Sequence, residues 1–196
     1  MVTRFTAAEL SSYRGAVVDD LVSASVRLLF VGINPSLWTA AVNAHFARPG
    51  NRFWPALHLA GITPWLVDAS GGLSDEDTRM LSDRGIGITN VVPVATARAD
   101  ELTIVQLRDG AARLVDMIDR LQPPVVAVLG ITAYRAAFDR PKAVAGRQAE
   151  RLADDRAELW VLPNPSGLNA HETVITLADA YRRAAGGMVN PRPAAP

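Results

Sequence analysis

The chain has 196 residues, a formal net charge of zero and no cysteine. With 49% hydrophobic residues it is long enough to bury a sizeable core, so we expect one globular domain over residues 1–185 and a disordered tail over residues 186–196. A sequence without cysteine excludes disulfides, thiolate-held iron–sulfur clusters and cysteine nucleophiles. Zero net charge argues against strong nonspecific binding to polyanions, but it does not exclude one local basic face.

Two further features narrow the class of protein. No apolar run approaches the roughly 20 residues that a membrane-spanning helix needs, and the N-terminal residues lack the apolar centre of a signal peptide. The three histidines, His45, His58 and His171, lie far apart in the sequence, and we expect structural roles for them. We therefore expect a cytoplasmic protein that needs no membrane, no metal and no other cofactor.

Helical and strand patterns alternate along the chain. In chain order, the sequence predicts helices over residues 7–21, 52–60, 101–121, 132–138 and 172–185, with a further capped helix beginning near Ser74. It predicts strands over residues 26–33, 86–92 and 123–130, and two more within 147–164 around an Asp-Asp-Arg turn. Residues 34–51 are predicted to form a long irregular loop, and Asn51 to cap the helix that follows.

The strand patterns indicate the fold class. Residues 26–33 and 123–130 are continuous apolar runs that end in or near glycine, as is typical of parallel strands buried on both faces. Together with the alternating helices, they predict an α/β protein, a three-layer α/β/α sandwich around a mostly parallel central sheet. In such sheets, ligands bind beyond the carboxyl ends of the strands.

The same tripeptide follows two of the predicted strands. Asn34-Pro35-Ser36 comes after the first strand and Asn164-Pro165-Ser166 after the last. One Asn-Pro is a common turn signal, but two at the ends of buried parallel strands predict a cleft with two walls. Asparagine is neither an acid nor a base near neutral pH, so a role in this cleft would be to orient groups.

Two stretches extend these tripeptides into longer motifs. They are "GINPSLWTAAVNAHFARPGNRFW", residues 32–54, and "LPNPSGLNA", residues 162–170. With "GITNVV", "VVAVLG" and "GRQ" elsewhere in the chain, they closely resemble the mismatch-specific uracil/thymine DNA glycosylases, a branch of the uracil-DNA glycosylase superfamily. The likeness covers roughly residues 26–181, with the motifs in the family's order.

The resemblance implies an enzyme that flips uracil, or a related damaged base, out of DNA and hydrolyses its N-glycosidic bond, with double-stranded DNA as partner. It implies that Asn34 holds the attacking water and that the ring of Phe46 stacks on the flipped base. It further implies that the amides of Ile33 and Phe46 donate to the base carbonyls. Gly32 opens this motif, and Thr39 matches a hydroxyl residue of the family's pocket.

The second motif is implied to contact DNA through Asn164, Ser166, Gly167, Leu168 and Asn169. Leu168 would act as a wedge that fills the gap left by the flipped base. The chain departs from the family where Asn169 and Ala170 replace a Ser-Arg pair, which puts wedge strength and selectivity for the opposite base in doubt. Asn164 occupies the position of a histidine found in other branches of the superfamily.

Lysine and arginine content bears on the reaction type. Lys142 is the only lysine and is far in sequence from both motifs, so we expect a monofunctional glycosylase without the Schiff-base chemistry of a lyase. Arg48, Arg52 and Arg98 are candidates for phosphate contacts, with salt bridges as the alternative. We expect a monomer.

Two other functions stay open from the sequence. The first is a glycosylase or lesion-binding protein for a base other than uracil, since stacking and backbone donors do not by themselves reject a bulkier base. The second is a small-molecule α/β hydrolase or nucleotide-binding domain. The sequence has no phosphate-binding glycine loop and no Ser-His-Asp order to support that second class.

Overall fold

The computed structural model describes residues 5–152 and 156–186. Most of the predicted tail, and the two aspartates of the predicted Asp-Asp-Arg turn, lie outside these residues. None of the helices in the described ranges is both long and apolar enough to cross a membrane.

A five-stranded sheet forms the centre of the molecule, in the order β2-β1-β3-β5-β4. Four strands are parallel, and only β4 at one edge pairs antiparallel with its neighbour. This confirms the predicted α/β fold with a mostly parallel sheet. The strands are β1 Leu28–Gly32, β2 Ile86–Asn90, β3 Val125–Leu129, β4 Gly146–Leu152 and β5 Ala157–Leu162.

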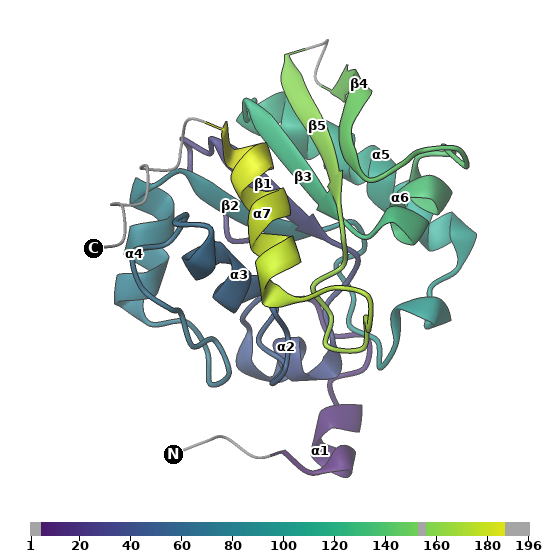
Figure 1. Cartoon of the computed structure of the whole chain (residues 1–196). Helices are drawn as coiled ribbons and strands as arrows, with labels where there is room; N and C mark the ends of the chain where they lie inside the picture. Colours follow the sequence, from purple (N-terminus) through teal and green to yellow (C-terminus); the bar gives the residue numbers. More distant parts are fainter. Residues whose placement is uncertain (1–4, 153–155, 187–196) are drawn as a thin grey trace.

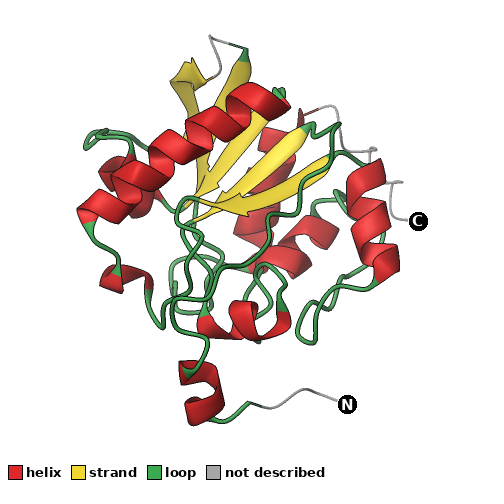
Figure 2. Ribbon diagram, turned by 180° about the vertical axis from the view of Figure 1, so that it is seen from behind, coloured by secondary structure: helices red, strands yellow, loops and turns green. Residues whose placement is uncertain are grey.

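Helices cover both faces of this sheet. Figure 1 shows α7 in front of the strands, and Figure 2 shows α5 crossing the opposite face. Leu28 and Phe30 of β1 pack with α3, α4 and α7, whereas Leu29 and Val31 pack with α5 and α6. The helices are α1 Ala7–Ser11, α2 Leu37–Val42, α3 Phe53–Leu59, α4 Asp75–Asp83, α5 Ile104–Leu121, α6 Ile131–Ala137 and α7 Val174–Ala185, with a 3-10 turn, η1, at Ala99–Glu101.

The predicted helix over residues 7–21 is wrong beyond its first turns. Helix α1 ends at Ser11, and Gly15 turns the chain with a φ of 79°. The following residues cross the open edge of β2, where Leu21 and Ile88 exchange two backbone hydrogen bonds of 2.8 and 2.9 Å. The unpaired edge of the sheet therefore prevails over the moderate apolar stripe that suggested a longer helix.

The segment predicted as an irregular loop, residues 34–51, contains helix α2. The Ser36 side chain caps this helix by accepting from the Thr39 amide, and Asn43 ends it in the left-handed conformation. The Asn-Pro-Ser tripeptide is thus both a turn and a helix start. The predicted Asn51 cap is wrong by one residue, because α3 begins at Phe53 and Arg52 is its N-cap, without a side-chain cap bond. Asn51 still satisfies the first amide of the helix, since its Oδ1 accepts from the Phe53 amide at 2.9 Å.

Candidate active site

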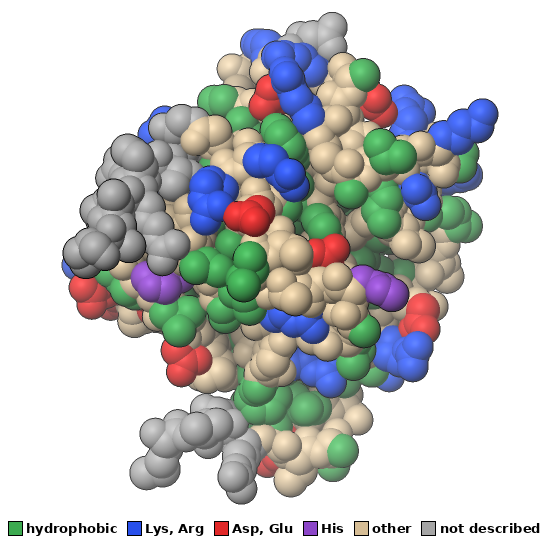
Figure 3. All heavy atoms as spheres, viewed as in Figure 1, with side chains coloured by type: hydrophobic (Ala, Val, Ile, Leu, Met, Phe, Trp, Pro, Cys, Tyr) green, Lys and Arg blue, Asp and Glu red, His purple; other side chains and the backbone are tan. Residues whose placement is uncertain are grey.

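A cleft of about 910 Å³ opens at the carboxyl ends of the parallel strands. Both Asn-Pro-Ser loops line it, as two of its walls. Other lining residues come from the segments 45–51, 96–100 and 129–133 and from Asn90. On the face seen in Figure 3, Lys and Arg side chains are interspersed with acidic ones, as the zero net charge suggests.

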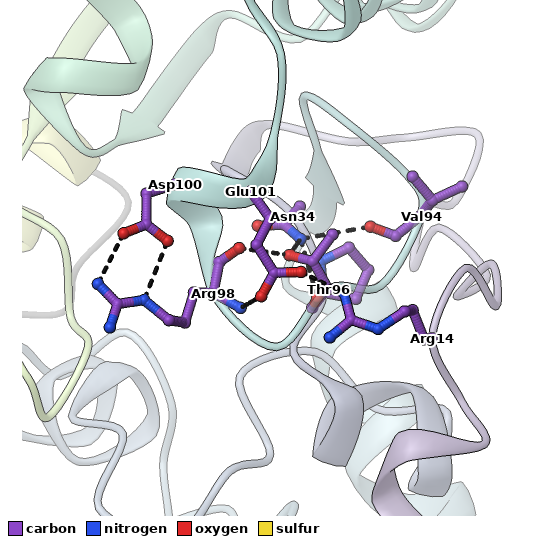
Figure 4. A network of polar contacts seen from close by, with 8 residues as sticks. Arg14, Asn34, Val94, Thr96, Arg98, Asp100 and Glu101 are labelled. Atoms are coloured by element: carbon purple, nitrogen blue, oxygen red, sulfur yellow. Dashed lines mark hydrogen bonds and ion pairs between the residues drawn. The ribbon is translucent and has the colours of Figure 1, made fainter.

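Asn34 has its side-chain amide oriented by three acceptors (Figure 4). Its Nδ2 donates to Thr96 Oγ1 at 2.8 Å, and lies 3.1 Å from the Pro35 carbonyl and 3.3 Å from the Val94 carbonyl. The Thr96 hydroxyl donates to the Arg98 carbonyl at 2.7 Å, so it must accept from Asn34. This network assigns the nitrogen and oxygen of the amide. Within the described residues, Asn34 Oδ1 accepts no hydrogen bond and remains available to a group in the cleft.

A second layer of charged residues supports this network. Glu101 Oε1 accepts from the Arg98 amide at 3.0 Å, and the same carboxylate pairs with Arg14. Arg98 makes two hydrogen bonds of 2.6 and 3.0 Å to Asp100, which lower the pKa of that carboxyl. The side chains of Arg98 and Asp100 are largely exposed at the cleft. Arg98 therefore forms a salt bridge, one of its two predicted roles.

Phe46 lines the cleft and is half-buried. Its ring stacks on the buried Phe53 with the centroids 4.0 Å apart and the planes 25° apart. A Cβ added to Gly32 would lie 2.4 Å from Asn90 Oδ1 and 3.1 Å from Phe46 Cζ. Only glycine fits at this close approach, which joins the end of β1 to Phe46 and Asn90.

The remaining predicted residues of the first motif also line the cleft. Ile33 and Phe46 donate no backbone hydrogen bond to another described residue, so their N–H groups are available to a ligand. Thr39 is buried, and its hydroxyl accepts from Ser36 Oγ at 3.1 Å. Its observed contact is therefore part of the cap of α2.

Asn90 and His45 form a buried polar pair that the sequence interpretation missed. Asn90 Nδ2 lies 3.2 Å from His45 Nδ1, and His45 Nε2 lies 2.9 Å from the Asp19 carbonyl. The carbonyl can only accept, so Nε2 carries the proton and Nδ1 accepts from Asn90. Burial lowers the pKa of His45 and keeps it neutral. A signal existed, because Asn90 is a polar residue inside a mostly apolar strand pattern, near its carboxyl end.

The second motif forms a loop, residues 166–172, that is tied together by its own polar groups. Asn164 Oδ1 accepts from the Ser166 amide at 3.0 Å, and Ser166 Oγ accepts from the Leu168 amide at 3.3 Å. Asn169 Nδ2 donates to the Asn164 carbonyl at 3.1 Å. Leu168 protrudes from the loop and is 78% exposed. The side chains of Asn164, Ser166 and Asn169 thus stabilise the loop that presents Leu168.

The two remaining candidates for phosphate contacts, and the single lysine, differ in their surroundings. Arg52 donates to the carbonyls of this loop and makes no ion pair with a described residue. Arg48 is exposed and lines the cleft, whereas Lys142 is exposed and lies outside the cleft lining. No group of three or more His, Asp or Glu side chains in residues 5–152 and 156–186 is arranged to hold a metal ion.

Comparison with known proteins identifies the class. The family model of the uracil DNA glycosylase superfamily matches residues 20–185. The protein therefore belongs to the uracil DNA glycosylase superfamily, whose members are hydrolases that act on DNA.

A solved structure shares the fold. It is the solution NMR structure of a protein from Methanosarcina acetivorans provisionally assigned as a uracil DNA glycosylase, with 17% sequence identity and a TM-score of 0.55. The match covers 89% of this chain and 99% of that one. At this identity the likeness shows the common fold alone.

Proposed function

We propose that the protein is a monofunctional DNA glycosylase of the mismatch-specific uracil/thymine type. It would excise uracil, and related deaminated or etheno bases, from G:U mismatches in double-stranded DNA and so initiate base excision repair. Residues 1–185 would act as one glycosylase domain, as a monomer. The observation that carries the proposal is Asn34, whose amide nitrogen is held by Thr96 and Val94 while its oxygen stays free in the cleft.

The free oxygen suits the chemistry of glycosidic-bond hydrolysis. The C1′–N1 bond breaks with its electron pair leaving on the uracil, and the sugar becomes an oxocarbenium-like cation. Such a cation needs a well-placed water more than a strong base. Asn34 Oδ1 accepts a hydrogen bond from that water and aims its oxygen at C1′, so its contribution is orientation. The water then loses a proton to solvent as the new C1′–O bond forms.

The leaving base would be held by groups around Phe46. Stacking on the Phe46 ring orients the flipped base, and the free N–H groups of Ile33 and Phe46 stabilise charge that develops on its carbonyl oxygens. Asn90, which lines the cleft close to Gly32 and Phe46, would read the edge of the base. Because His45 holds its amide in one orientation, Asn90 offers an acceptor and a donor that match the N3–H and O4 of uracil.

The exposed Leu168 would occupy the space that the flipped nucleotide leaves in the stack. After excision an abasic site remains, because no amine is available for a Schiff base in the described cleft: Lys142 lies outside it. The single lysine of the sequence thus supports a monofunctional enzyme.

A second substrate class remains open because the cleft is not closed around a pyrimidine. Stacking on Phe46 does not reject a larger base. A glycosylase or lesion-binding protein for a non-uracil base is therefore the alternative within DNA repair. Membership of the superfamily leaves the small-molecule α/β hydrolase without support.

A panel of labelled DNA tests the proposal. The wild type is incubated with duplexes carrying U:G, U:A, T:G or an etheno-cytosine, and with single-stranded uracil, and abasic sites are then cleaved with alkali. The proposal predicts strand breaks at U:G that need the alkali step. Breaks only at etheno-cytosine would favour the alternative, and tight binding without any breaks would indicate a lesion-binding protein.

A further inference from the structure

Arg52 links the two motifs of the cleft in a way that neither motif alone indicates. Its Nη1 donates to the carbonyls of Asn169 at 2.9 Å and Glu172 at 2.5 Å, and its Nη2 donates to the carbonyl of Gly167 at 3.1 Å. Its own backbone amide donates to the Pro165 carbonyl at 3.0 Å. One residue at the start of α3 therefore contacts the loop 166–172 or its preceding residue four times.

The loop also touches the first motif next to this arginine. A Cβ added to Gly167 would lie 2.7 Å from the Gly50 carbonyl oxygen, so the two backbones are in direct contact. Arg52 is partly buried, and within the described residues its guanidinium has no carboxylate partner. The guanidinium of Arg52 therefore donates its N–H groups to backbone carbonyls of the loop 166–172. Without these hydrogen bonds, the loop would be held by its internal turns and its contact with Gly50.

Leu168 benefits from this support because, among the described residues, the loop is otherwise held by its own turn hydrogen bonds and by its contact with Gly50. Its two neighbours in the sequence, Gly167 and Asn169, have carbonyls that accept hydrogen bonds from Arg52. The side chain of Leu168 itself is 78% exposed. A wedge that replaces a base in the stack works against the unstacking cost of a few kcal/mol. A loop held only by its own turn hydrogen bonds would change conformation instead of keeping Leu168 in the stack.

We propose that Arg52 is a positioning residue that holds the loop 166–172 rigid so that Leu168 can act as the wedge. The inference rests on the proposed function and adds a specific role to a residue of the first motif. A guanidinium suits this role because its planar fork carries five N–H donors and can bridge three carbonyls at once. A lysine keeps the charge but offers a single compact ammonium that does not span them.

The proposal separates two roles that Arg52 could have in DNA binding. If the residue only supplied charge to the phosphate backbone, Arg52→Lys would retain activity. If it holds the wedge, Arg52→Lys and Arg52→Gln both lose activity. The loss falls on substrates in which the uracil must be extruded from a stack. A merely structural defect would instead reduce excision from every substrate alike.

The test measures single-turnover excision of uracil from two DNAs, one with a U:G pair and one with the uracil inside an unpaired internal bubble, where extrusion costs less. Arg52→Lys, Arg52→Gln and Leu168→Ala are compared with Arg79→Gln, an exposed arginine on α4 that serves as a matched control. Thermal unfolding of each variant checks that it is folded. If Arg52→Gln is not folded, Arg52→Lys takes its place in the combination with Leu168→Ala.

We expect both Arg52 variants to lose about tenfold or more on U:G, as expected for lost hydrogen bonds to a charged group, and less than about threefold on the bubble. In the Leu168→Ala background, Arg52→Gln should cost nothing further, because both changes remove the same wedge. Equal losses on both DNAs, full activity of Arg52→Lys, or additive losses would each overturn the inference. A wild type that excises uracil from neither DNA would instead refute the proposed function, and the wedge role with it.

Discussion

The two Asn-Pro-Ser loops use the same three residues in opposite ways. In the first loop the nitrogen of Asn34 is held by Thr96 and Val94, and its oxygen is free. In the second, the oxygen of Asn164 is used by the amide of Ser166. The Asn164 oxygen is used inside its own tripeptide, whereas the Asn34 nitrogen is held by Thr96 and Val94 outside its tripeptide, which leaves the Asn34 oxygen free. The first loop is built to hold a group, and the second to hold its own shape.

The glycines of the two motifs test this difference most strongly. Gly32→Ala places a Cβ 2.4 Å from Asn90 Oδ1 and 3.1 Å from the Phe46 ring. We expect uracil excision to fall about a hundredfold or more on any DNA, and thermal stability to fall because the site is overpacked.

Gly167→Ala places a Cβ 2.7 Å from the Gly50 carbonyl oxygen. This change should reduce excision from duplex DNA while sparing the bubble. Excision rates and melting temperatures of both variants measure this, and equal effects on the bubble would contradict the comparison.

Thr96→Val sharpens the account of the first loop. The change keeps the shape of the side chain but removes the oxygen that accepts from Asn34 Nδ2. The Asn34 amide then loses its shortest hydrogen bond and can turn, so we expect excision to fall about tenfold with little change in affinity for DNA. Thr39→Val, in which the lost hydroxyl bonds to Ser36 rather than to Asn34, is the comparison. A Thr96→Val enzyme as fast as wild type would show that the amide needs no such support.

The dependence on pH tests the neutral state of His45. Burial lowers the pKa of His45 below its usual 6.5, so near pH 7 it is neutral in both the folded and the unfolded chain. As the pH falls below 6.5, the unfolded chain takes up a proton that the folded one resists, and stability should decline until the folded pKa is reached. Melting temperature should therefore fall over this acidic window, less steeply in His45→Gln. A pH-independent difference between the two proteins would contradict this assignment.

The smallest effect is expected at Lys142, which is exposed and outside the cleft lining. Lys142→Gln should excise uracil at the wild-type rate within about twofold, since no Schiff base is part of the reaction. Borohydride should trap no covalent complex with DNA in either protein. A trapped complex that vanishes in Lys142→Gln would refute the monofunctional mechanism.

The sheet and most of its helices were predictable because local patterns specify them. The continuous apolar runs before Gly32 and Gly130 belong to parallel strands that are buried on both faces. Each motif loop follows from its position after a parallel strand, β1 or β5. The helix over residues 7–21 was wrong because its second half meets the edge of β2, a contact that lies far away in the sequence. The start of α2 was missed because Ser36 was interpreted only as part of a turn.

The polar network of the cleft was harder to predict because its contacts are long-range. Asn90 acquires its orientation from His45, and Asn34 from Thr96, across 45 and 62 residues of chain. Arg52 was proposed as a phosphate contact or an ion-pair partner, yet it binds carbonyls more than a hundred residues away. Residue type and spacing show which chemistry is available, but hydrogen-bond partners decide how each side chain is used.

The most direct test of the central claim compares Asn34→Ala with Asn164→Ala in single-turnover excision from a U:G duplex and from the bubble DNA. If Asn34 orients the water, its loss should cost about a hundredfold or more on both DNAs. Asn164→Ala, which removes only a turn hydrogen bond of the wedge loop, should cost about tenfold or less, and chiefly on the duplex. Equal losses in the two variants, or an Asn34→Ala enzyme close to wild type, would contradict the opposite roles of the two loops.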